Sequence, residues 1–185
     1  MSGPADPQGQ AATLIARFDA ARDGFLAAFT QASDEALPYT PAGEEYALGV
    51  LPLHLQDSMN HYLEVYDRMA EANFGPVDLG ADLEMVANAA ELHQRLLTTK
   101  PTGADRPALL DDLNATHRRV TERFSALDDA SVTRQVAVVY SPGTDPYPTS
   151  VATIFDWLTD HYDEHIAQTT QLIERWQAEQ AEQAR

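Results

Sequence analysis

Along most of the chain, apolar residues recur every three or four positions, which is the spacing that places them on one face of an α-helix. Five segments share this pattern, with polar residues between the apolar ones. We therefore expect helices at about 10–33, 48–72, 81–98, 109–127 and 150–176. Serine or threonine precedes the last of them, and Thr149 or Ser150 is its expected N-cap.

The stretch before the last helix has a different composition. β-Branched residues dominate Gln135–Tyr140, and residues that form turns fill Ser141–Pro148. β-Branched side chains favour extended backbone, and the turn formers that follow cannot continue a helix. We expect an extended segment near 135–147 that is too short to build a sheet.

With no sheet available, helix must pack against helix to form the core. The pattern predicts an all-α fold, an up-and-down four-helix bundle with one short additional helix at 81–98. No repeat or linker divides the chain, so residues 1–185 are expected to form a single domain. About 1–9, rich in proline and glycine, and the polar 178–185 are expected to be flexible.

The chain is strongly acidic, with 29 Asp plus Glu against 12 Lys plus Arg and a formal charge of −17. This charge would repel phosphate backbones, so nucleic acid is not an expected partner. No apolar run reaches the roughly 20 residues of a membrane helix, and no secretory signal is recognisable. We therefore expect no membrane partner and a cytoplasmic location. Because cysteine is absent, any thiol must come from a substrate.

Two of the six histidines, His161 and His165, stand four residues apart on the last expected helix. This spacing stacks them about 6 Å apart along one face, within reach of a common ion. If Leu158 marks the centre of the apolar stripe, His165 lies roughly 20° and His161 roughly 60° from it. Both imidazoles therefore point into the bundle, where a cation would satisfy several ring nitrogens at once.

A third ligand must come from another helix, and spacing leaves two candidates open. His54 and His61 are one heptad apart on the second expected helix, so they share nearly the same azimuth at the edge of its apolar face. An i, i+4 histidine pair can also be satisfied by hydrogen bonds without any metal. His93 and His117 have polar neighbours in the sequence, so they are expected to be solvated and without a role.

Two segments around these histidines resemble the DinB-like family of metal-binding four-helix bundles. Thr149–Gln168, which contains His161-x-x-x-His165 followed by Gln168, is similar to the family's closing segment. Tyr46–His54 is similar to the stretch that leads to the family's first ligand, although Tyr46 and Ala47 replace the usual Trp-Ser. The resemblance implies that His54, His161 and His165 bind a metal, and it selects His54 over His61. The helix at 81–98 is additional to the family pattern.

A site of three neutral imidazoles leaves open positions on a divalent ion, as in catalytic zinc sites. Imidazole suits several metals, with zinc or nickel expected and iron or copper as alternatives. Asp57, one turn beyond His54, and Gln168, nearly one turn beyond His165, are candidates to orient the ligands or a substrate. No catalytic side chain is identified, and the reacting group would be a metal-bound water or a thiolate.

The resemblance also implies a function, because relatives include S-transferases that use low-molecular-weight thiols. We expect a metal-dependent thiol S-transferase acting on a small molecule. A metal-dependent hydrolase of a small molecule and a non-catalytic, stress-associated metal-binding or dimeric structural module are the alternatives. A homodimer is expected by analogy with these relatives. A ferritin-like di-iron protein is excluded because Glu-x-x-His does not occur.

Overall fold

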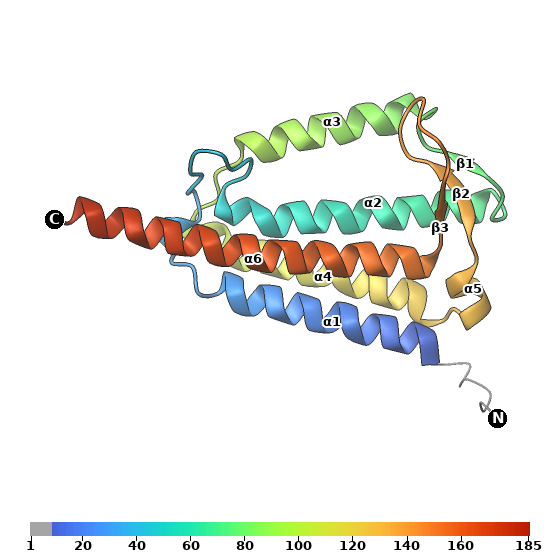
Figure 1. Ribbon diagram of the computed structural model, residues 1–185, viewed down its shortest axis with the longest axis horizontal. Helices are drawn as coiled ribbons and strands as arrows, with labels where there is room; N and C mark the ends of the chain where they lie inside the picture. The colour runs from blue at the N-terminus through green and yellow to red at the C-terminus, as the bar shows by residue number, and fades with distance from the viewer. Residues whose placement is uncertain (1–8) are drawn as a thin grey trace.

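A computed structural model of the chain describes residues 9–185. Four long helices lie side by side, as Figure 1 shows: α1 (Gly9–Phe29), α2 (Leu51–Glu71), α4 (Arg106–Ser125) and α6 (Val151–Gln183). Helix α1 packs mainly against α6 and α2 mainly against α4, while α2 also contacts α6 and α1 contacts α4. The prediction of a mostly helical fold is confirmed.

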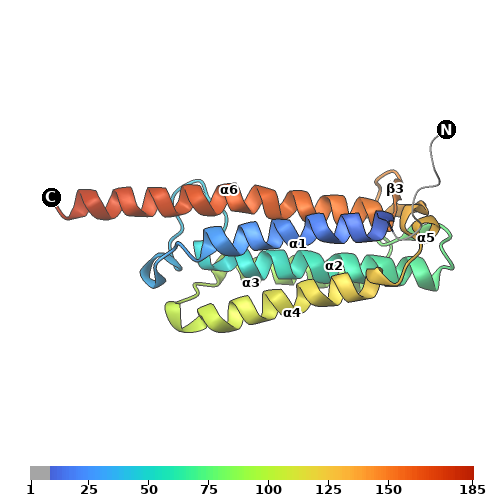
Figure 2. The ribbon, with the colours of Figure 1, turned by 90° about the horizontal axis from the view of Figure 1, so that it is seen from below.

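The additional helix predicted at 81–98 is α3 (Leu83–Thr98), and it lies beside α2, apart from the other long helices (Figure 1). In chain order, α1, α2, α3, α4 and α6 each run opposite to the helix named before it (Figure 1). Among the four long helices, α1 and α6 therefore run in one direction and α2 and α4 in the other. Seen from below in Figure 2, the C-terminal part of α6 extends beyond the other helices.

The ends of the helices follow from local sequence. Ser150 caps α6, because its hydroxyl accepts a hydrogen bond from the backbone N–H of Thr153, and Asp82 caps α3 in the same way. At the end of α2, Asn73 and Phe74 adopt φ angles of 52° and 58°, the left-handed conformation that commonly terminates a helix. Short 3-10 turns occupy the connections: η1 (Asp34–Ala36), η2 (Leu48–Val50) and η3 (Gly103–Asp105).

The terminal segments bear only partly on the expected flexibility. Helix α6 continues to Gln183, so the polar 178–185 is largely helical, and its flexibility stays a prediction. Apart from Gly9, which begins α1, the segment 1–9 lies outside the described residues. Within residues 9–185, no helix is long and apolar enough to cross a membrane.

The prediction that the chain builds no sheet is wrong. The expected extended segment forms a hairpin of β2 (Val136–Val139) and β3 (Tyr147–Thr149), and β1 (Val77–Asp78) pairs with β2 in parallel, with Val77 opposite Val138. The apolar face of β2 packs on Val65 and Met69 near the end of α2. Two residues after a proline carry no periodicity, so β1 could not be recognised from the sequence. The five-residue helix α5 (Asp129–Thr133) was not predicted either.

The expectation that His117 is solvated is also wrong. Its side chain is fully buried in the main core, where the ring stacks on Phe18 with centroids 4.0 Å apart. Its Nε2 lies 2.8 Å from a carboxylate oxygen of Asp19, and its Nδ1 lies 3.4 Å from the hydroxyl of Tyr162. The polar residues next to His117 in the sequence misled the prediction, because neighbours on a helix project at other azimuths. A buried imidazole needs such partners.

Helix α3 is expected to be less protected than the four long helices. Leu96 is the one buried residue among its 16, whereas α2 buries an apolar stripe along its length. Helices with few buried apolar contacts open at low free-energy cost. In hydrogen–deuterium exchange of the native protein, α3 amides should exchange well before those of α2. Equal protection in the two helices would contradict this prediction.

Candidate metal centre

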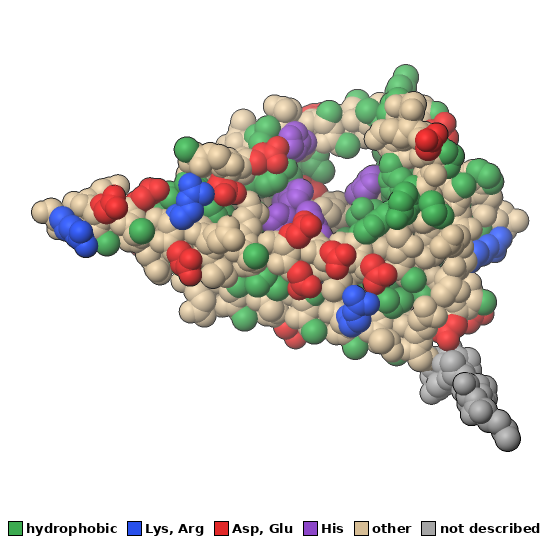
Figure 3. Space-filling model, in the orientation of Figure 1, with side chains coloured by type: hydrophobic (Ala, Val, Ile, Leu, Met, Phe, Trp, Pro, Cys, Tyr) green, Lys and Arg blue, Asp and Glu red, His purple; other side chains and the backbone are tan. Residues whose placement is uncertain are grey.

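The structure brings together the three histidines that the sequence analysis selected. His54 projects from α2, and His161 and His165 project from successive turns of α6. One ring nitrogen from each lies within 4.8 Å of the other two. The ring centroids are 4.5–5.0 Å apart and the planes are steeply inclined, so the rings do not stack face to face. In Figure 3, histidine side chains gather around the hollow beneath α3.

His165 is held by a chain of hydrogen bonds that fixes its tautomer. Arg175 donates to a carboxylate oxygen of Glu44, at 3.2 Å, and Nε2 of Gln168 donates to the other oxygen, at 2.8 Å. Because a carboxylate only accepts, the amide oxygen of Gln168 must face His165, where it lies 2.7 Å from Nδ1. Nδ1 therefore carries the proton, and Nε2 keeps a free lone pair.

This lone pair accepts no hydrogen bond from any described residue. Nε2 of His165 is buried and lacks a hydrogen-bond partner among residues 9–185. A buried polar atom without a partner is costly and calls for a physical explanation. Because the ring of His165 also lies within 4.5–5.0 Å of two other imidazole rings, centroid to centroid, a shared cation is an explanation that fits the donor set.

The other two rings are positioned by residues of α2 and of the preceding loop. Ser58, one turn after His54, places its hydroxyl 3.2 Å from Nε2 of His161 and donates to the carbonyl oxygen of His54, at 3.0 Å. Tyr46 packs against the ring of His54, with centroids 4.9 Å apart, and its hydroxyl lies 3.1 Å from Nδ1 of His93. The sequence placed His54 only at the edge of the apolar face of α2. The contact with Tyr46 helps to hold its ring toward the other two histidines.

All three imidazoles are in the neutral form that binds metals. Burial, and then repulsion from the neighbouring histidines, lowers the pKa of His54 from 6.5 to about 4 and that of His161 to about 3. Burial also lowers the pKa of His165. A metal–nitrogen bond is about 2 Å long, so two bonds span about 4 Å. The three nitrogens can therefore share one ion after small side-chain rotations.

The remaining candidate residues lie near the centre but outside the cluster. Gln168 contacts His165, whereas Asp57 lines a cavity. His61 also faces the cavity, so the structure places His54 rather than His61 beside the other two histidines. His93, expected to be solvated, is half-buried and hydrogen-bonded to Tyr46.

A cavity of about 560 Å³ adjoins the cluster between α2 and α3. His54 and Ser58 line it from α2, and Leu92, His93 and Leu96 line it from α3. In the space-filling view the same region is a hollow between α3 and the rest of the molecule (Figure 3). A volume of this size accommodates a small organic molecule.

Two features of the site could not be found by sequence reasoning. Glu44 lies in the loop before α2 and reaches Gln168 on α6, and no spacing rule connects a loop residue to a helix so far along the chain. Ser58 is four residues after His54 and hence on the same face of α2, but serine is common on helix surfaces. Of the two, only Ser58 had a signal in the sequence, which is its four-residue spacing from His54.

Together, the fold and the site define a helical protein with a candidate three-histidine metal centre beside a cavity. In a sequence comparison, a model of the DinB superfamily matches residues 17–169. The match covers most of the chain and includes all three histidines, and the chain belongs to the DinB superfamily. No curated protein and no solved structure matches the chain.

The metal-free protein should lose stability as the pH falls. Unfolded histidines have a pKa near 6.5, whereas burial holds the pKa of His54 at about 4 and that of His161 at about 3 in the folded state. Below about pH 6.5 the unfolded chain therefore binds protons that the folded chain does not, which favours unfolding. The Tm should fall between about pH 8 and about pH 5, a range in which most carboxylates stay ionised.

The comparison that isolates the cluster is His161→Gln, which removes one of these titrating groups. Its Tm should fall less steeply with pH than that of the wild type. A wild-type Tm that does not change over this range would contradict the burial of neutral histidines.

The hydrogen-bond chain behind His165 should strengthen metal binding. Gln168→Ala and Glu44→Ala each free the imidazole to rotate and to change tautomer, so zinc affinity should fall on the order of 10- to 100-fold. Competition with a chromophoric chelator measures this. Gln171→Ala, an exposed glutamine on the same helix, is the matched control and should bind zinc like the wild type. If Gln168→Ala bound zinc with wild-type affinity, the hydrogen bonds from Glu44 and Gln168 to His165 would not contribute to metal binding.

Proposed function

We propose that the protein binds one divalent metal ion through His54, His161 and His165 and uses it to act on a small molecule in the adjacent cavity. The observation that carries the proposal is Nε2 of His165, which is buried without a hydrogen-bond partner among residues 9–185, on a ring that lies beside two further neutral imidazoles. Zinc and nickel are the favoured ions, because both bind imidazole well and accept three protein ligands. Iron and copper are the alternatives.

In this proposal, α1, α2, α4 and α6 form the four-helix bundle of the family, and α3 is the addition that encloses the cavity. The ligands come from α2 and α6, which pack against each other, and α2 also lines the cavity below α3. Gln168 acts as the orienting residue for His165, and Asp57 contributes to the substrate side of the site. The bundle thereby supplies rigid ligands, while α3 shapes the space for a substrate.

The reaction that we favour is transfer of a thiol sulfur to a small electrophile. A divalent ion at this centre supplies positive charge that lowers the pKa of a thiol or water that reaches it. The chain has no cysteine, so the thiol is a substrate. The cavity wall formed by His54 and Ser58 would hold its reacting end near the cluster. In the transfer, the sulfur–carbon bond forms, the leaving group departs with its electron pair, and the thiol proton passes to solvent.

One observation favours the non-catalytic alternative. The histidines join α2 to α6, so a bound ion would also fasten two helices and stabilise the fold. An ion with this role alone would raise the Tm without supporting turnover. The proposed homodimer would be compatible with either role.

The test is turnover by the metal-loaded protein. Protein loaded with zinc or nickel should conjugate monochlorobimane to a small thiol, and His161→Ala should reduce the rate to that of the uncatalysed reaction. Gln171→Ala, outside the site, should keep the wild-type rate. Hydrolysis of a small ester without thiol turnover would instead support the hydrolase. Metal that raises the Tm without turnover of either substrate would support the structural module and contradict catalysis.

A further inference from the structure

The cavity beside the histidine cluster has an unbalanced charge. Four carboxylates line it, those of Asp57, Glu64, Asp82 and Glu84, against the single guanidinium of Arg68. This guanidinium is already engaged, because it forms a 2.8 Å ion pair with Asp82 and lies 3.8 Å from Glu64. The lining is therefore negative, and it would attract a cation and repel an anion.

Asp57 differs from the other acidic residues of the lining. It lies one turn beyond His54, at the end of the cavity near the cluster, and its Oδ2 is buried without a hydrogen-bond partner among residues 9–185. Burial raises the pKa of Asp57, and the charge of Arg95 on α3 lowers it only in part. A partly buried carboxylate without a partner destabilises a fold, so its presence at a cavity wall points to a ligand.

The rest of this end of the cavity suits a compact organic cation. Tyr46 and His93 provide aromatic surface close to His54, and aromatic faces attract cationic nitrogen. Leu92 and Leu96 of α3 add an apolar wall. An ammonium or guanidinium group could thus donate to Asp57 while its carbon skeleton contacts the apolar and aromatic side chains.

We propose that the cavity binds small molecules that carry a positively charged nitrogen, and that Asp57 is the residue that receives this nitrogen. The proposal rests on the proposed function in taking the cavity as the substrate site. It narrows the substrates to amines and related cations, and it makes Asp57 a determinant of specificity rather than a metal ligand. Thiols or electrophiles with a carboxylate at the corresponding position are disfavoured.

The experiment compares three probes with one carbon skeleton and different charge. Benzylammonium, benzyl alcohol and benzoate are titrated into the full-length protein, both metal-free and zinc-loaded, and binding is followed by NMR chemical shifts. Benzylammonium should bind at least about tenfold more tightly than benzyl alcohol, the factor expected for a hydrogen bond to a charged group. Benzoate should not bind the metal-free protein.

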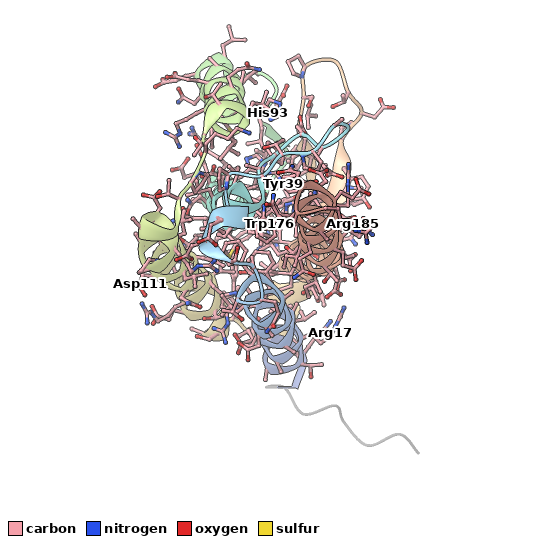
Figure 4. All side chains as sticks on the ribbon, turned by 90° about the vertical axis from the view of Figure 1, so that its left-hand side faces the viewer. Arg17, Tyr39, His93, Asp111, Trp176 and Arg185 are labelled. Atoms are coloured by element: carbon pink, nitrogen blue, oxygen red, sulfur yellow. The ribbon has the colours of Figure 1, made fainter. Side chains whose placement is uncertain are left out.

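Two variants locate the charge. Asp57→Asn keeps the shape of the side chain and should abolish the preference for benzylammonium, with a Tm equal to or above that of the wild type because an unpaired carboxylate is removed. Asp111→Asn is the matched control, since Asp111 is exposed on α4 away from α3 (Figure 4), and it should keep the preference.

The outcomes separate this proposal from the proposed function. If none of the probes binds, if all bind equally, or if Asp57→Asn keeps the preference, the proposal is wrong. Should Asp57→Asn not fold, the wild type decides the matter: added salt should weaken binding of benzylammonium and leave benzyl alcohol unchanged, and equal salt dependence would overturn the proposal. Because no thiol and no turnover are involved, a negative result here leaves the proposed transfer activity standing, and the reverse also holds.

Discussion

The packing of α2 against α6 is the contact on which the site depends, because it brings three imidazoles to one point. Burial lowers the pKa values of these rings, so they stay neutral there. A neutral imidazole has one N–H and one lone pair, so a cation is the partner that can bind the lone pairs of all three rings at once. The hydrogen bonds from Arg175 through Glu44 and Gln168 to His165 extend this constraint to the loop before α2 and to the later turns of α6.

Much of the scaffold could be predicted from the sequence, because helical periodicity extends over the long helices. The inward azimuths of His161 and His165 came from the same periodicity. His54 was different: it shares its azimuth with His61, and only the family resemblance separated the two. The structure shows why His54 reaches the cluster, since Tyr46 packs on one side of its ring and the ring meets those of α6 on the other.

The features that escaped prediction depend on contacts between distant parts of the chain. Strand β1 exists because Val77 pairs with Val138, and two residues alone show no pattern. His117 is buried because α1 supplies Phe18 and Asp19 as partners, although its own neighbours are polar. Glu44 reaches Gln168 from a loop. The cavity likewise exists because α3 lies apart from α2, and the distance between two helices cannot be read from local sequence.

If His54, His161 and His165 together hold one divalent ion, equilibrium zinc binding to the purified protein will depend on these three side chains. We expect one zinc ion per wild-type chain, loss of that ion in His165→Ala, and retention in His61→Ala, because the ring of His61 lines the cavity but is not part of the cluster. Zinc binding that survives His165→Ala, or that disappears in His61→Ala with the fold intact, would contradict this three-histidine site.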